Sequence, residues 1–220
     1  MKLDTRLRAI LPYIRGESMA DVGCDHGKLC CYCLQHGLVK RAIATDISKP
    51  SLDKAQSLAL QYGLSLTCIH TDGVRDMPEH VDTAVIAGMG AHEIVHILRQ
   101  GAHKADRWVL VPHQHPTVLR RYLAESGWRP IADFVVRCAG KFYWILCVER
   151  GVYTPDAHAL YLGACDPSDP DYRAYLRMTL DKCRNLLAKT RDDAIAAELQ
   201  QQCAVCERAI GESHDDRTDS

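Results

Sequence analysis

The chain lacks any stretch typical of a membrane span or an export signal. No run approaches the roughly 18 consecutive apolar residues that a transmembrane helix needs, and the N-terminal sequence MKLDTRLRAI has no apolar core of the kind found in signal peptides. With 47% hydrophobic and 25% charged residues in 220, the composition excludes a disordered or fibrous chain. We therefore expect a cytoplasmic protein without membrane contact, built from one core and a smaller additional element.

Net charge is almost absent as well. The formal charge at pH 7 is −1, and four acidic residues lie in positions 211–220, which we expect to form an acidic, disordered tail. Because the rest of the chain is close to neutral, a surface for nucleic acid must come from a local cluster of basic residues. The pair Arg120-Arg121 is expected to be a solvated helix face.

Cysteine is abundant, but the pattern of a disulfide scaffold is missing. The 11 cysteines are an odd number in a large chain without an export signal, so we expect reduced thiols. Cys30, Cys31 and Cys33 are predicted to pack a helix closely against a sheet. A metal site that uses Cys24, Cys30, Cys33 and His36 is an alternative, weakened because no second CxxC pair accompanies the cluster.

Short apolar runs alternate with helical patterns over the first part of the chain. The predicted strands are Met19–Val22, Ala42–Asp46, Leu66–His70, Thr83–Ala87 and Trp108–Val111, and the predicted helices are Lys28–Gln35, Ser51–Tyr62, His92–Arg99 and Val118–Ser126. Two further runs, Ile131–Cys138 and Phe142–Val148, are joined only by AGK and predict an antiparallel hairpin. The fold class is therefore α/β, with a Rossmann-like doubly wound sheet that ends in an antiparallel hairpin, as in class I methyltransferases.

A different period begins near residue 171. Apolar residues follow the spacing 4, 4, 3, 4 twice, at Tyr172, Leu176, Leu180, Cys183 and Leu187 and again at Ile195, Leu199, Cys203, Cys206 and Ile210. This pattern predicts a coiled-coil-like helical hairpin that turns near Arg191–Asp193. Whether it docks on the main domain or protrudes as an arm stays open. The expected boundaries are 1–163 for the main domain, 164–210 for the two-helix arm and 211–220 for the tail.

The stretch ADVGCDHG indicates a ligand turn. Asp21 lies within the first predicted strand and Gly23 at its exit, where glycine lets a ligand approach the backbone at the start of the next helix. The turn does not match GxGxxG, because Asp25 stands where a dinucleotide site needs its second glycine, and a carboxylate there repels phosphates. These features favour a positively charged ligand without phosphates, and S-adenosylmethionine meets both demands.

Residues at the ends of three later predicted strands also favour S-adenosylmethionine. Asp46 follows Gly23 by 23 residues, where a carboxylate can accept hydrogen bonds from ribose hydroxyls, although this feature alone would serve NAD equally well. Asp72, in HTDG, is expected near the adenine amino group. Gly88-Met89-Gly90 forms another turn of close approach, and the D/N-P-P-Y/F motif of enzymes that methylate exocyclic amines is absent. A ring nitrogen such as N1 of adenine has an in-plane lone pair, so its methylation mainly requires alignment.

The combination RL…ADVGCDHG…AIATD…TDG…AVIAGMG…KFYWI, followed by the two-helix tail, resembles the TrmK family of bacterial tRNA (adenine-N1)-methyltransferases, which act on adenine 22. The resemblance spans residues 3–210. It implies S-adenosylmethionine as cofactor, bound by residues 1–163, tRNA as partner, and an arm that helps to hold tRNA. We also expect a monomer without a metal. The implied catalytic residues are Arg6, Asp25 and His26, and the cofactor residues are Asp21, Gly23, Asp25, Asp46, Ile47, Asp72, Gly73, Gly88, Met89 and Gly90.

Other functions stay open at this point. His92-Glu93-Ile94-Val95-His96 satisfies HExxH, the zinc protease pattern, in which two histidines bind the metal and the glutamate activates water. Its position directly after a nucleotide-type glycine turn argues against it, since a doubly wound sheet offers no third ligand there. A methyltransferase with another RNA or nucleobase target, and a cofactor-binding module without catalysis, are the remaining alternatives.

Overall fold

The computed structural model describes residues 1–215 and contains a seven-stranded sheet with the order β3-β2-β1-β4-β5-β7-β6. The strands are β1 Ser18–Val22, β2 Arg41–Asp46, β3 Thr67–His70, β4 Val81–Met89, β5 Ala105–Pro112, β6 Trp128–Cys138 and β7 Lys141–Arg150. The first five pair in parallel, and β7 is antiparallel to both β5 and β6. The predicted parallel sheet with a closing hairpin is confirmed.

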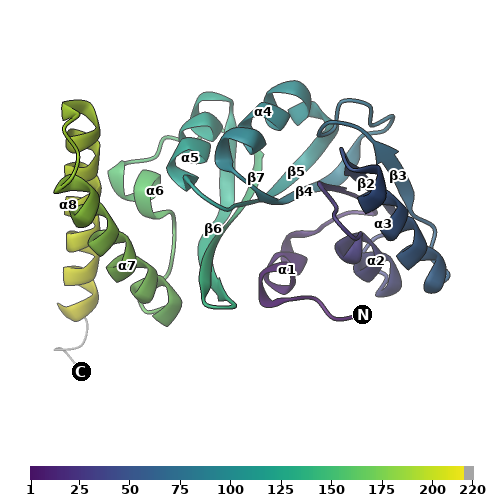
Figure 1. Ribbon diagram of the computed structural model, residues 1–220, viewed down its shortest axis with the longest axis horizontal. Helices are drawn as coiled ribbons and strands as arrows, with labels where there is room; N and C mark the ends of the chain where they lie inside the picture. Colours follow the sequence, from purple (N-terminus) through teal and green to yellow (C-terminus); the bar gives the residue numbers. More distant parts are fainter. Residues whose placement is uncertain (216–220) are drawn as a thin grey trace.

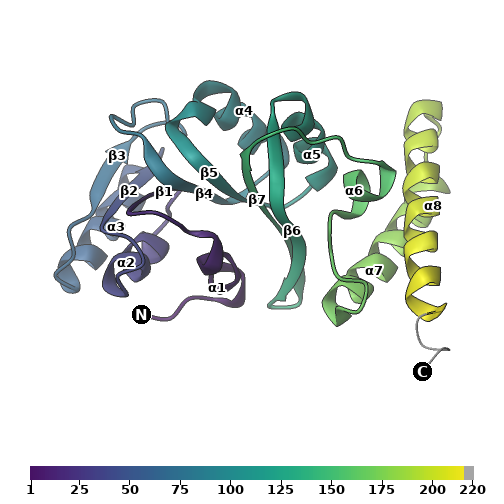
Figure 2. The ribbon, with the colours of Figure 1, turned by 180° about the vertical axis from the view of Figure 1, so that it is seen from behind.

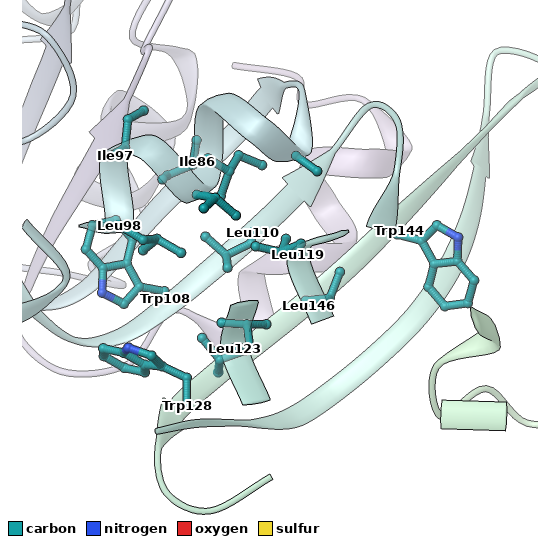
Figure 3. Close-up of a cluster of buried hydrophobic side chains, with 14 of the residues drawn as sticks. Ile86, Ile97, Leu98, Trp108, Leu110, Leu119, Leu123, Trp128, Trp144 and Leu146 are labelled. Carbon is teal, nitrogen blue, oxygen red and sulfur yellow. The ribbon is translucent and has the colours of Figure 1, made fainter. Parts of the chain in front are cut away.

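Helices cover both faces of the sheet. In chain order, α1 Thr5–Ile10, α2 Lys28–Gln35 and α3 Lys49–Gln61 lie on one face, and α4 Ala91–Gly101 and α5 Pro116–Glu125 lie on the other (Figures 1 and 2). Along β5, Trp108 and Leu110 join the buried cluster under α4 and α5 (Figure 3). Val109 and Val111 join the cluster on the opposite face. This alternation explains the continuous apolar run, because each face of a covered strand needs apolar side chains.

Most of the cysteines are small buried side chains. All eleven, which fall within the described residues, are free thiols. Cys30, Cys31 and Cys33 of α2 are fully buried against the sheet, and burial raises the pKa of the Cys33 thiol to about 12. A Cβ at Gly27 would lie 2.6 Å from Cβ of Ala55, so this glycine allows α2 to approach α3 closely. The expectation of reduced thiols at a helix-sheet contact agrees with this packing.

The C-terminal helices α7 Pro170–Leu187 and α8 Asp193–Asp215 lie side by side at one end of the molecule, beyond α6 Ala157–Leu162 (Figures 1 and 2). Tyr172, Leu176 and Cys206 are buried and belong to the same apolar cluster as Trp144 of β7. The Tyr175 ring meets Trp144 edge-on, with centroids 5.2 Å apart. The stripes therefore both join the two helices and dock the arm on the main domain.

Half of the acidic segment at the C-terminus, which was expected to be disordered, is helical. Helix α8 continues through residues 211–215, the first half of the expected tail, and residues 216–220 lie outside the described residues. Within residues 1–215, no helix combines the length and the hydropathy needed to cross a bilayer.

Arg120 departs from the sequence expectation. Its side chain is fully buried, and its Nε and Nη2 each donate to an oxygen of Asp133 in β6 at 2.7 Å. Its Nη1 donates to the carbonyl oxygens of Leu160 and Tyr161 in α6. The prediction of a solvated face is thus wrong for Arg120, because its carboxylate partner is 13 residues away in sequence, and correct for the half-exposed Arg121.

Candidate active site

A hydrogen bond at the carboxyl edge of the sheet joins the turn after β1 to the aspartate that ends β2. The parallel register pairs Val22 of β1 with Thr45 of β2, so both strands end at the same level. The Asp25 backbone N–H donates to Oδ2 of Asp46 at 3.2 Å, and the Ser48 N–H donates to Oδ1 of Asp46 at 2.8 Å. Asp46 therefore fixes the turn after β1 relative to the start of α3.

A third carboxylate, that of Asp21, lies in β1 just before this turn. Asp21 of β1 is buried, and its pKa is raised to about 7, chiefly by desolvation, while Arg6 opposes the shift and the charges of Asp46 and Asp25 add to it. Asp21 therefore lies close enough to Asp25, Asp46 and Arg6 for their charges to change its pKa. Because the charges of Asp25 and Asp46 disfavour an ionised Asp21, the region favours a cationic ligand.

The turn from Gly23 to Gly27 has a strained backbone. Gly23 has φ of +73°, which favours glycine, and the atom nearest to an added Cβ would be the terminal Cε of the Met89 side chain in β4, at 2.3 Å. Asp25 has φ of +52°, an unusual value for a residue other than glycine. Gly27 is the N-cap of α2, without a capping hydrogen bond from a described side chain. Asp25, 76% exposed, instead lies with Oδ2 2.7 Å from Nδ1 of His26.

The turn after β4 brings together residues from three distant segments. Gly88 has φ of +109°, and the space beside it is bounded by Nε2 of His113 and Nη1 of Arg6, which would lie 3.6 and 3.8 Å from an added Cβ. The Arg6 guanidinium lies over the Tyr143 ring at 5.3 Å, and the His113 ring is 5.9 Å from the same ring. The predicted residue Arg6 thus has two partners that the sequence reasoning missed.

Position along the sheet could have revealed both missed residues. His113 directly follows β5, whose carboxyl end lies beside that of β4. Tyr143 lies near the start of β7, and because β7 is antiparallel, its beginning lies at the edge where the parallel strands end. Searching only the ends of parallel strands overlooks such a residue.

Of the remaining predicted cofactor residues, Gly90 is the N-cap of α4, and the other three occupy the β2 and β3 ends. Ile47 is 70% exposed beside Asp46, which leaves an apolar surface open to a flat ring. The exposed Asp72 carboxylate lies 3.9 Å from the Arg75 guanidinium. Gly73 has a packing role, since a Cβ there would lie 3.0 Å from Ile97, and its carbonyl accepts a hydrogen bond from the Thr45 hydroxyl.

Neither proposed metal cluster is assembled in the described part of the chain, where no group of three or more His, Cys, Asp or Glu side chains converges. His96 of the HExxH match contacts the Gln100 side chain at 2.7 Å. The Cys30 thiol donates to the Ile43 carbonyl, and His36 stacks on Tyr32 with ring centroids 4.0 Å apart. The zinc hydrolase hypothesis has no structural support among the side chains that the structure describes.

Comparisons with known proteins relate the chain to methyltransferases. Residues 3–146 match the family model described as a methyltransferase domain. A curated tRNA (adenine(22)-N(1))-methyltransferase of Bacillus subtilis is 32% identical over 170 residues, which cover 74% of this chain and 70% of that protein. Sp1610 of Streptococcus pneumoniae, crystallised in complex with S-adenosyl-L-methionine, has a TM-score of 0.85 and 25% identity, covering 95% of this chain and all of that one.

A third comparison concerns the fold. The structure of Mycoplasma capricolum TrmK in complex with S-adenosyl-homocysteine superposes with a TM-score of 0.86 at 20% identity, over 96% of this chain and 99% of that one. The likeness therefore includes the C-terminal arm as well as the sheet. Together with the sequence match to the Bacillus subtilis enzyme, it shows that the chain belongs to the TrmK family of bacterial tRNA (adenine-N1)-methyltransferases.

Proposed function

We propose that this protein uses S-adenosylmethionine to methylate N1 of an adenine in tRNA, at the position numbered 22 in the name of its Bacillus subtilis relative. The observation that carries the proposal is the group of three aspartates, Asp21, Asp25 and Asp46, at the carboxyl edge of the sheet. Such a group suits a cationic ligand and would repel the phosphates of a dinucleotide.

The cofactor site follows from the chemistry of these side chains. Asp46 accepts hydrogen bonds from the ribose hydroxyls, and Ile47 offers its exposed side chain to the adenine ring. Asp72 is assigned to the adenine amino group. The buried Asp21 carboxylate supplies negative charge for the ammonium group. The turns at Gly23 and Gly88 permit the close approach of the ligand to the backbone.

S-Adenosylmethionine supplies a methyl group on a sulfonium, whose carbon–sulfur bond breaks as the N1 lone pair forms the new carbon–nitrogen bond, leaving S-adenosylhomocysteine and a cationic 1-methyladenine. Since N1 already carries a lone pair, the protein needs no base to deprotonate it. Asp25 stabilises the positive charge that moves to the base, and His26, which contacts the Asp25 carboxylate, positions it. Tyr143, flanked by Arg6 and His113 beside Gly88, provides an aromatic surface for the acceptor base.

The product identifies the reaction. We would incubate tRNA with the protein and S-adenosylmethionine that carries a trideuteromethyl group, digest the RNA and analyse its nucleosides by mass spectrometry. Labelled 1-methyladenosine is expected. Labelled N6-methyladenosine, another labelled nucleoside, or retention of the cofactor without any labelled RNA would refute the proposal and favour one of the alternative functions.

Three further expectations belong to the same proposal. The protein is expected to act as a monomer, in the cytoplasm and without a bound metal. Sedimentation analysis of the purified protein, with elemental analysis of the same sample, tests the first and third. A dimer at working concentration, or stoichiometric zinc, would contradict them.

A further inference from the structure

A groove separates the main domain from the C-terminal arm. It has a volume of about 450 Å³ and lies between the segment after β5, strand β7, and the helices α7 and α8. His113 is one of the residues that line it, and the same histidine lies beside Gly88 in the candidate active site and donates its backbone N–H to the Met89 carbonyl at 2.9 Å. His113 therefore borders both the groove and the place assigned to the acceptor base.

The arm presents an uncovered apolar wall to this groove. Met178, Leu186 and Ile195 are among the most exposed large apolar side chains of the described residues, with 46%, 46% and 51% of their surface accessible, and all three line the groove. Met178 and Leu186 flank Lys182 at intervals of four residues, so the three lie on one face of α7. Apolar surface left open beside a cation is typical of a binding site rather than of a solvated helix.

Charges in the groove are mainly positive. Arg121 of α5 lies 2.9 Å from Glu198 of α8, and this half-exposed ion pair spans the gap between domain and arm. Lys182 has no ion pair with a described residue, so its charge is left without a partner beside the Arg121–Glu198 pair. A nucleotide combines the matching features, because its base has apolar faces and its phosphate is negative.

We propose that this groove holds an unpaired nucleotide that neighbours the target adenine in the tRNA chain. Its base lies against Met178 and Leu186, and its phosphate lies near Lys182. The inference rests on the proposed function. The volume is in the range of small-ligand sites, roughly 300–1,000 Å³, whereas a protein partner would need a far larger contact surface. Because His113 borders both the groove and the place assigned to the acceptor base, a segment of the substrate itself is the favoured occupant.

Steady-state methylation of tRNA by two groove variants, each with a matched control, tests the proposal. Met178→Glu places a negative charge on the apolar wall, and Leu60→Glu makes the same change at an exposed residue of α3 outside the groove. Lys182→Gln removes one positive charge, and Arg177→Gln does so on the same helix at an exposed residue that does not line the groove. Both groove residues are exposed, so their substitution should leave the fold intact.

We expect the KM for tRNA to rise about tenfold or more in Met178→Glu, with kcat and the affinity for S-adenosylmethionine retained, and neither control to change. The logarithm of the tRNA association constant falls with the logarithm of salt concentration. In Lys182→Gln, the magnitude of this slope should decrease by about 0.7, the value for one phosphate contact to a single strand. Unchanged KM and salt slope in both groove variants, with an active parent protein, would overturn the groove assignment alone. An inactive parent protein would overturn the proposed function and the groove together.

Discussion

Oδ2 of Asp25 lies 2.7 Å from Nδ1 of His26, on a turn that Asp46 holds through the Asp25 backbone N–H. The Asp46 carboxylate, at the end of β2, thus fixes the backbone of the turn after β1, which carries the Asp25 carboxylate. Asp25 tolerates a left-handed conformation within this arrangement, and its side chain does not cap α2. A charge held in a strained conformation at the exit of β1 is better explained by chemistry at the site than by helix stability.

Asp25→Asn should therefore lower the single-turnover rate of methylation by about a hundredfold or more, roughly 2.7 kcal/mol, because the amide keeps the shape and loses the charge. The melting temperature should stay close to that of the parent protein, since 76% of the Asp25 side chain is exposed. Asp106→Asn, an exposed carboxylate at the start of β5, serves as the control. A normal rate in Asp25→Asn would show that the turn does not stabilise the developing charge.

Cofactor affinity should depend on pH through Asp21. Its pKa of about 7 means that the carboxyl is mostly neutral at pH 6 and mostly ionised at pH 8. If only the ionised form binds the cation, affinity rises about tenfold over that interval. Calorimetric titration with S-adenosylmethionine would measure the rise, and Asp21→Asn should abolish it. A flat profile in the parent protein would contradict the placement of Asp21 beside the ammonium group.

The same group predicts a change in stability. Since folding raises the pKa of Asp21 from 3.8 to about 7, its contribution to stability is greatest below about pH 4 and is lost as the pH rises toward 7. Asp21→Asn should therefore melt at a higher temperature than the parent protein at pH 8. A lower melting temperature there would mean that the ionised carboxylate has a stabilising partner.

Tyr143→Leu should lower kcat/KM for tRNA by between about fivefold and a hundredfold, corresponding to the 1–3 kcal/mol that stacking of one base contributes. Tyr143→Phe should retain most of the activity because it keeps the ring. Calorimetry with S-adenosylmethionine should give the same affinity for both variants. Tyr62→Leu changes an exposed tyrosine after α3 and controls for the loss of an aromatic residue. Equal kinetics for Tyr143→Leu and this control would remove Tyr143 from the acceptor site.

Two adjacent arginines of α5 should differ strongly in their effect on folding. Arg120→Ala leaves the buried Asp133 carboxylate without its partner, and we expect the free energy of unfolding to fall by about 3–5 kcal/mol. Arg121→Ala removes only a half-exposed ion pair, which contributes about 1 kcal/mol or less. Denaturant unfolding measures both. Similar losses in the two variants would contradict the structural role of Arg120.

Much of the fold could be predicted from the sequence because strands covered on both faces give continuous apolar runs. The run in Trp108–Val111 is an example, since its alternate residues enter two different cores. The short helices α1 and α6, of six residues each, gave no comparable period. The burial of Arg120 could not be predicted either, because nothing local distinguishes a basic residue with a buried carboxylate partner from a solvated one.

The site was predictable where it depends on strand ends and less so where distant segments meet. Asp25 and Asp46 follow strands that are neighbours in the sheet, so their proximity follows from the topology. The contact of Tyr143 with Arg6 joins β7 to α1, which are far apart in sequence. The groove along the arm depends on how α7 docks on β7, and apolar spacing alone left that docking open.

Methylation of paired tRNA transcripts tests the central claim most directly. The two transcripts would be identical except at position 22, with adenine in one and guanine in the other, and each would be incubated with the protein and labelled S-adenosylmethionine. The account predicts one labelled methyl group per molecule, recovered as 1-methyladenosine, in the adenine transcript and none in the other. Equal labelling of both transcripts, or labelling of neither, would contradict it.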